Sequence, residues 1–288
     1  MYRYSVSFTD EFCSMPEWRR AAAASKIKRI ELSCAHSTPP ETLSRTVSAL
    51  DEMQKKKELE VASIHIPFAG DRWNIANLDE SLRQANVRDI LDFLKRTDPL
   101  NSKLYTIHGS AEPIEESERP CAIEQMRKSL TELLPAITER SAYLNVEILP
   151  RTCIGRTAEE LLQVLADFPE QIGINFDVNH LCGHPESVPN GIRLLSKRIR
   201  SMHLSDYDGV DECHWYPGSG VLNWSEIMNA VKSIDHDVLL IFEVAHLASP
   251  SWQKRPIAPE ILFQAAENSA FFLENAAELS RRRAEFRF

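Results

Sequence analysis

Short apolar runs rich in β-branched residues recur along the chain, and each is followed by a longer segment with helical spacing of apolar residues. Two of these helical segments cover positions 82–94 and 123–137, where Leu and Ile recur on one face. The apolar runs number eight and occupy positions 3–8, 29–34, 60–68, 103–109, 143–149, 172–178, 199–206 and 237–244. This alternation is typical of repeated β-α units around a parallel sheet.

Two local signals mark where helices begin. Pro39 and Pro40 suit the first turn of a helix, because proline lacks the amide hydrogen that is unpaired there anyway. Thr157 followed by Glu160 has the spacing of a capping box, which predicts a helix directly after the fifth apolar run.

Eight strands and eight helices in alternation favour an α/β protein with one closed barrel, a single (β/α)8 TIM barrel. The count alone also fits an open doubly wound sheet. The chain has 288 residues, and barrels of this kind often run to about 250 residues as one unit. No linker, low-complexity stretch or change of composition divides the sequence. We therefore predict one domain over residues 1–288.

Composition narrows the class of protein. Hydrophobic residues make up 43% and charged residues 26% of the chain, as in soluble globular proteins. The net charge of −9 is not that of a broad basic surface, so we do not expect nucleic acid as a partner. The six cysteines form no CxxC pair, which is typical of free thiols. Without a secretory signal or a stretch of ~20 apolar residues, we expect a cytoplasmic protein with no membrane partner.

Ionisable side chains gather where the predicted strands end, which is where barrels of this class carry their reacting groups. A single histidine there is more often hydrogen-bonded than a ligand, so the combination carries the prediction. The residues concerned are His65, His108, Glu147, Asp177, His180, His203, Asp206 and Glu243, with Glu212 and His214 in the loop after the seventh strand.

Three carboxylates, Glu147, Asp177 and Glu243, would come from strands five, six and eight. In a water-poor barrel mouth they would repel each other unless a cation lay between them. Together with His203 they form a mixed oxygen and nitrogen set that suits Mn, Mg, Co or Zn. The sequence therefore predicts one divalent metal ion on these four residues.

The order of these residues resembles the xylose isomerase-like TIM barrel superfamily over essentially the whole chain, in particular its sugar phosphate isomerases and epimerases. The resemblance rests on Glu147, Asp-x-x-His at 177–180, His-x-x-Asp at 203–206 and Glu243. It implies the same four metal ligands and a small carbohydrate substrate. It also implies proton transfer beside a carbonyl through an enediolate, with Glu147 and Glu243 as acid and base. We expect the other polar rim residues to contact the substrate: His65, His108, Arg151, His180, Glu212 and His214.

Two positions depart from the ketose 3-epimerases of this superfamily. Those enzymes carry a second Glu six residues after the strand-five Glu, and an Arg after the strand-seven His. Cys153 stands at the first place and His214 near the second, which puts plain ketose 3-epimerization in doubt. The alternatives are a metal-dependent lyase or hydratase acting on a keto-sugar, and a barrel that binds a sugar or metal without catalysis. The sequence leaves open whether the chain forms a homo-oligomer.

A further alternative is a DNA repair enzyme similar to endonuclease IV, which holds three zinc ions on nine ligands. Counterparts of nearly all nine types are present: His65, His108, Glu147, Asp177, His180, His203, Glu212, His214 and Glu243. Against this alternative, loops 69–77 and 112–120 show no dense basic run of the kind that enters DNA.

Several other residues near the predicted rim have two interpretations. Arg151 could bind a substrate carboxylate or phosphate, or could be an exposed loop residue. Positions 217–220 fit a phosphate loop or a tight turn. Glu31 and His246 could support the metal ligands from behind, but we expect an ordinary hydrogen-bonded role for each.

Overall fold

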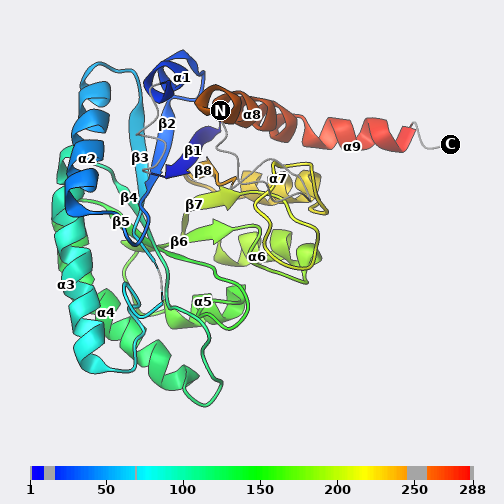
Figure 1. Ribbon diagram of the computed structural model, residues 1–288. Coiled ribbons are helices and arrows are strands. Elements are labelled where there is room, and N and C mark those ends of the chain that lie inside the picture. Colours follow the sequence, from blue (N-terminus) through cyan, green and yellow to red (C-terminus); the bar gives the residue numbers. More distant parts are fainter. Residues whose placement is uncertain (1, 10–16, 69, 245–257, 286–288) are drawn as a thin grey trace.

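The computed structural model describes residues 2–9, 17–68, 70–244 and 258–285, and its centre is a closed barrel of parallel strands (Figure 1). The strands pair in sequence order, and β8 pairs with β1 to close the barrel. This confirms the prediction of a single (β/α)8 TIM barrel. The alternative prediction of an open doubly wound sheet is wrong. Each predicted run contains one strand: β1 Arg3–Thr9, β2 Arg29–Ser33, β3 Glu60–His65, β4 Leu104–Ile107, β5 Tyr143–Glu147, β6 Ile172–Asp177, β7 Ile199–Leu204 and β8 Leu239–Phe242.

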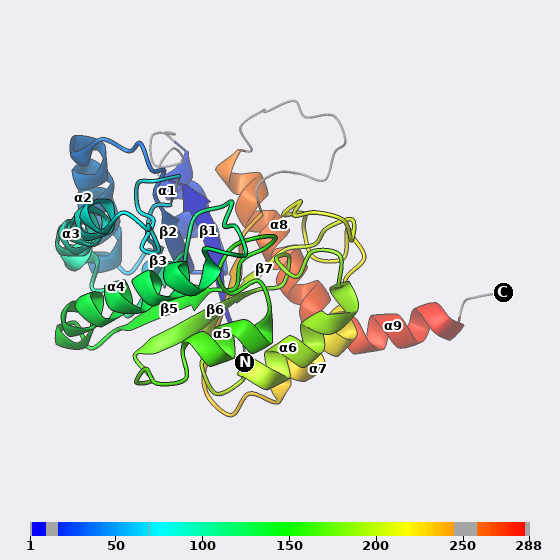
Figure 2. The same ribbon diagram turned by 90° about the horizontal axis from the view of Figure 1, so that it is seen from below.

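Helices surround the barrel, as the view from below shows (Figure 2). They are α1 Trp18–Ala24, α2 Pro40–Lys55, α3 Glu80–Thr97, α4 Arg119–Glu139, α5 Ala158–Val164, α6 Val188–Leu195, α7 Trp224–Lys232, α8 Pro259–Glu274 and α9 Ala276–Glu285, with 3-10 turns η2 Asp98–Leu100 and η3 Pro185–Ser187. Both predicted helix starts are confirmed. Helix α2 begins at Pro40, and the Thr157 side chain accepts a hydrogen bond from the Glu160 amide at the start of α5.

The inside of the barrel is polar below the mouth, whereas such interiors are usually filled by Val, Ile and Leu. The Asn145 amide donates to the Ser201 hydroxyl at 3.1 Å, and Ser201 donates to Asn175 at 2.8 Å. The Asn175 amide in turn donates to the Glu147 carboxylate at 3.3 Å. A ladder of neutral hydrogen bonds therefore supports a carboxylate at the end of β5.

Asp206 fixes the loop that follows β7. Its backbone forms an antiparallel bridge with Trp215, and its carboxylate accepts hydrogen bonds from the Gly218 amide at 2.9 Å and the Trp224 indole at 2.8 Å. A Cβ on Gly220 would lie 2.1 Å from the Tyr207 carbonyl oxygen, so only glycine fits there. Positions 217–220 thus form a turn packed on Asp206, and the loop between places Glu212 and His214 over the barrel mouth.

We predict that Asp206→Ala lowers the free energy of unfolding by about 2–3 kcal/mol, because several buried donors would lose their acceptor. Urea denaturation followed by circular dichroism measures this loss. The matched control is Asp208→Ala in the same loop, where the carboxylate is exposed and accepts from the nearby backbone amides of Val210 and Asp211. Equal losses in both variants would show that Asp206 does not organise the loop.

Candidate metal and carbohydrate site

Four side chains from different strands converge at the carboxyl end of the barrel: Glu147, Asp177, His203 and Glu243. Each offers a ligand atom, and these atoms all lie within 4.8 Å of one another. Glu147 and Asp177 end β5 and β6, His203 lies in β7, and Glu243 directly follows β8. Three of the four are fully or almost fully buried, whereas the Glu243 side chain is 25% exposed. The residues predicted as metal ligands are therefore brought together.

The charges in this cluster depend strongly on one another. Burial would raise the pKa of Glu147, but the charge of His203 and hydrogen bonds from His108 and His203 hold it well below its ordinary value. Burial would lower the pKa of His203, but Glu243, Glu31 and Glu147 raise it well above its usual range. The negative charge of these carboxylates can therefore be balanced either by protons on the histidines or by a bound cation.

Asp177 provides a test of whether a cation fits. Its Oδ2 is buried and accepts no hydrogen bond from any residue that the structure describes, and the imidazole nitrogens nearest to it are His180 Nε2 at 3.4 Å and His203 Nδ1 at 3.8 Å. Burial raises the pKa of Asp177 to about 6, despite the opposing charges of His180 and His214. A buried carboxylate oxygen without a donor is costly unless it is neutralised or coordinated. The free oxygen and the mixed donor set both fit a divalent cation.

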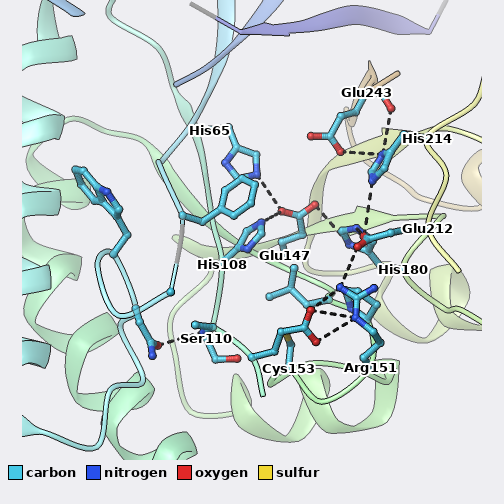
Figure 3. Close-up of a pocket in the computed structure, with 18 residues that line it drawn as sticks. His65, His108, Ser110, Glu147, Arg151, Cys153, His180, Glu212, His214 and Glu243 are labelled. Atoms are coloured by element: carbon cyan, nitrogen blue, oxygen red, sulfur yellow. Dashed lines mark hydrogen bonds and ion pairs between the residues drawn. The ribbon is translucent and has the colours of Figure 1, made fainter. Parts of the chain in front are cut away.

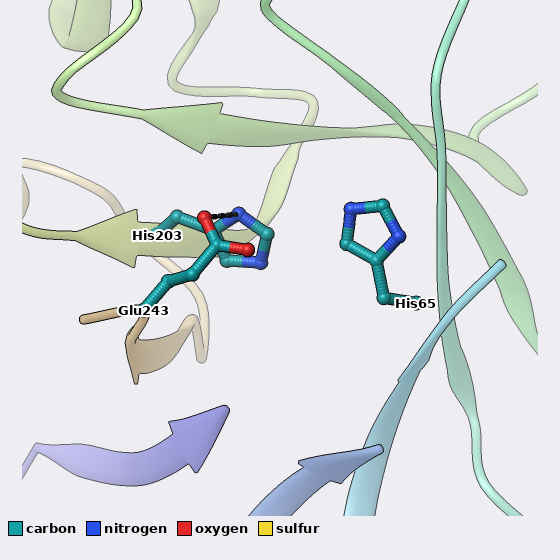
Figure 4. A group of neighbouring side chains, drawn as sticks. All are labelled: His65, His203 and Glu243. Carbon is teal, nitrogen blue, oxygen red and sulfur yellow. Dashed lines mark ion pairs between the residues drawn. The ribbon is translucent and has the colours of Figure 1, made fainter. Parts of the chain in front are cut away.

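Further groups with ligand geometry adjoin the four-residue cluster. One consists of His65, His108 and Glu147, and another of Asp177, His180 and His214. A third joins His65 to His203 and Glu243, with His65 facing the other two across the barrel mouth (Figure 4). Because Glu147 and Asp177 each belong to two groups, the arrangement could hold more than one cation.

A cavity of about 390 Å³ opens above the cluster, which is enough for a small ligand. Glu147 and Glu243 line it, but Asp177 and His203 do not (Figure 3). All six residues predicted to contact the substrate line this cavity: His65, His108, Arg151, His180, Glu212 and His214.

One wall of the cavity is apolar. The Phe68 ring stacks on His108 with centroids 3.8 Å apart and planes at 19°, and Phe68 remains 46% exposed. Leu149 and Cys153 also line the cavity. Phe68 ends the third predicted apolar run, but the prediction considered ionisable side chains there and did not include this ring.

Arg151 lies at the rim, where three acids bind its guanidinium. It pairs with Glu112 through its Nε at 3.0 Å, with Asp211 at 2.9 Å and with Glu212 at 2.9 Å. The other Glu212 oxygen lies 3.0 Å from His180 Nε2. Arg151 therefore joins three loops and holds Glu212 against His180, so an anionic substrate would have to compete with these acids. Its partners Glu112 and Asp211 were not among the predicted residues.

Among the residues predicted to support the ligands, His246 lies outside the described residues. The Glu31 carboxylate is hydrogen-bonded, as expected, and one of its two partners is His203 at 3.0 Å.

The sequence matches the family described as xylose isomerase-like TIM barrel over residues 19–263. An uncharacterized protein of Methanocaldococcus jannaschii is 25% identical over 205 residues, which is 69% of each chain. A D-psicose 3-epimerase of Enterocloster bolteae is 25% identical over 256 residues, covering 83% of this chain and 80% of its own. An apurinic-apyrimidinic endonuclease 1 of Plasmodium berghei is 24% identical over 186 residues, covering 59% of this chain and 35% of its own.

Solved structures share the fold. The crystal structure of a D-tagatose 3-epimerase-like protein superimposes with a TM-score of 0.78 at 21% sequence identity, covering 98% of this chain and 99% of its own. None of the helices in the described part of the chain combines the length and the apolar character needed to cross a membrane.

We predict that Mn²⁺ or Co²⁺ raises the unfolding temperature of the wild type and that Asp177→Asn loses most of this rise, because a neutral amide replaces a negative ligand. A cation at 100 times its Kd would stabilise the fold by about 2.7 kcal/mol. Differential scanning fluorimetry measures the shift. Asp211→Asn is the control, since this rim carboxylate should leave the response unchanged. A full response in folded Asp177→Asn would remove Asp177 from the ligand set.

Proposed function

Because the chain belongs to the xylose isomerase-like TIM barrel family, we propose that it is a divalent-metal-dependent sugar isomerase or epimerase. One observation carries this proposal. Of the four candidate ligands, only Glu147 and Glu243 also line the cavity. They are thus the two carboxylates that can contact both a cation and a bound substrate, whereas Asp177 and His203 would contact the cation alone.

The chain's own residues supply the proton transfer. A divalent cation bound at the cluster would polarise a carbonyl oxygen and the neighbouring hydroxyl oxygen. One carboxylate, Glu243 or Glu147, takes the proton from the carbon that bears this hydroxyl; the electrons of that C–H bond form a C=C bond, and the C=O π electrons move to the carbonyl oxygen. The second carboxyl group begins the reaction protonated and donates its proton to carbon, so one proton is removed and one is added. Phe68 and Leu149 offer an apolar wall to the carbon face of a sugar.

The curated D-psicose 3-epimerase relative favours a ketose as substrate. Cys153 argues against an identical reaction. Its thiol is buried at the cavity wall, and burial raises its pKa to about 12, so it stays neutral. A neutral thiol is a weak hydrogen-bond acceptor and does not replace a carboxylate that grips sugar hydroxyls. We therefore expect a related isomerisation or epimerisation at another position or on another sugar; a lyase or hydratase would share the proton-abstraction step.

We expect Glu243→Gln and Glu147→Gln each to lower turnover by about 10²-fold or more, because general acid-base catalysis contributes at least that much. The assay supplies D-psicose, D-tagatose, D-fructose and L-ribulose with Mn²⁺ in D2O. Mass spectrometry reads deuterium at the carbon beside the carbonyl. Asp208→Asn is the control carboxylate outside the cavity.

Two outcomes would contradict this mechanism. One is a product that contains no solvent deuterium in either direction of the reaction. The other is a Glu243→Gln variant with full turnover. If the wild type binds these sugars but converts none of them, the protein would instead be a sugar-binding protein.

The adjoining ligand groups favour one second candidate, a phosphoester hydrolase with several metal ions. In such sites two or more cations hold the attacking and leaving oxygens. The match to an apurinic-apyrimidinic endonuclease 1 of Plasmodium berghei points to the same class of reaction, although it covers only 35% of that chain.

Metal content separates the two candidates. We expect about one divalent ion per chain by elemental analysis of protein purified without added metal, since one cation offsets most of the negative charge of the central cluster. Three zinc ions per chain, with cleavage of DNA containing an abasic site, would replace the sugar isomerase with the hydrolase. The control is the double variant His65→Gln/His180→Gln, whose metal content should remain one ion per chain because neither residue belongs to the central four-residue cluster.

A further inference from the structure

Glu31 is a carboxylate buried inside the barrel wall. It lies in β2 between Ile30 and Leu32, its side chain is fully buried, and it does not line the cavity. A buried carboxylate costs several kcal/mol unless its oxygens are paired. Its partners therefore indicate why it is there.

A register shift between Ile30 and Glu31 sets the direction of this side chain. The irregularity in the β2–β3 pairing places Glu31 beside Ser63, and such bulges commonly re-aim side chains near active sites. One Glu31 oxygen accepts a hydrogen bond from the Ser63 hydroxyl at 2.9 Å, and the other lies 3.0 Å from Nε2 of His203. Since β2 and β7 are not neighbours in the barrel, this contact crosses its interior.

The second nitrogen of His203 faces the carboxylate cluster. Its Nδ1 lies 2.8 Å from Glu147, 3.1 Å from Glu243 and 3.8 Å from Asp177. Both ring nitrogens face carboxylates, which are acceptors only, so each can hold a proton when no cation is bound. A cation among the three cluster carboxylates would replace the proton on Nδ1 and leave the proton on Nε2 beside Glu31. In the neutral imidazole the Nδ1 lone pair then points at the cluster, which is the form that binds a metal.

Two other histidines of the site contact carboxylates through Nε2, but their second nitrogen, Nδ1, is hydrogen-bonded to a backbone carbonyl and not to a second carboxylate. His65 Nδ1 contacts the Ile66 carbonyl at 2.9 Å, and His180 Nδ1 contacts the Ile148 carbonyl at 2.8 Å. A carbonyl oxygen fixes the tautomer but carries no full charge. A carboxylate also raises the basicity of the ring that it orients, which strengthens a metal–imidazole bond.

We propose that Glu31 is a positioning residue: it holds His203 with Nε2 protonated and Nδ1 directed at the cation, and it raises the cation affinity of the whole cluster. This inference rests on the cation of the proposed function but on no particular sugar or reaction. It also gives Ser63 a role, because the Ser63 hydroxyl keeps the Glu31 carboxylate facing His203.

Titration with Co²⁺ tests this without any substrate. Glu31→Gln keeps the size of the side chain and removes its charge, and we expect its Kd for Co²⁺ to rise about tenfold or more, as for other carboxylates that orient a metal-bound histidine. The visible absorption of bound Co²⁺ should also change, because the histidine ligand is reoriented. Ser63→Ala leaves the charge of Glu31 in place and removes only the hydrogen bond that orients its carboxylate, so we expect a smaller rise in Kd.

This experiment separates failure of the Glu31 proposal from failure of the proposed function. Tight Co²⁺ binding in the wild type with an unchanged Kd and spectrum in folded Glu31→Gln would overturn this proposal and leave the metal site intact. If the wild type binds no Co²⁺, both fail. If Glu31→Gln does not fold, the ring nitrogen shifts of His203 in the Zn²⁺-loaded wild type decide, with the signal assigned by its loss in His203→Asn. A proton on Nε2 supports the proposal, and a proton on Nδ1 overturns it.

Discussion

Three carboxylates share one buried space at the end of this barrel, and their mutual repulsion is the constraint on which the rest of the site depends. Glu147, Asp177 and Glu243 come from separate strands, and their oxygens approach the same point. Positive charge must therefore be present there, either as imidazolium or as a cation. Burial lowers the pKa of His180, but Asp177, Glu212 and Glu147 raise it to about 10, which shows how strongly the acids attract a proton when nothing else neutralises them. A divalent cation does so while leaving the histidines neutral and able to bind it.

Polar residues outside the carboxylate cluster also support it. Asn175 and Ser201 replace the branched apolar residues that usually fill such a barrel, and their hydrogen bonds end on Glu147. Asp206 holds the long loop that carries Glu212 and His214 back over the mouth. Packed polar groups therefore hold both the Glu147 carboxylate and this loop in position.

The fold and the central ligand set could be predicted from the sequence, and the reason is geometric. Strand and helix periods are local, and the ends of parallel strands meet at one rim, so Glu147, Asp177, His203 and Glu243 could be placed together without coordinates. The pairing of Arg151 with Glu112 and Asp211 depends on the paths of three loops, which have no period. The contact between Glu31 and His203 depends on a shift of register in β2 that one sequence does not reveal. The stacking of Phe68 on His108 depends likewise on an irregular segment.

Anomalous X-ray diffraction from crystals grown with Mn²⁺ tests the central claim most directly, because it locates the cation independently of any activity. The account predicts a strong anomalous peak bounded by carboxylate oxygens of Glu147, Asp177 and Glu243 and by Nδ1 of His203, at the short distances of metal coordination. The same four side chains in the same positions with no anomalous peak between them, at a Mn²⁺ concentration that saturates binding in solution, would contradict it.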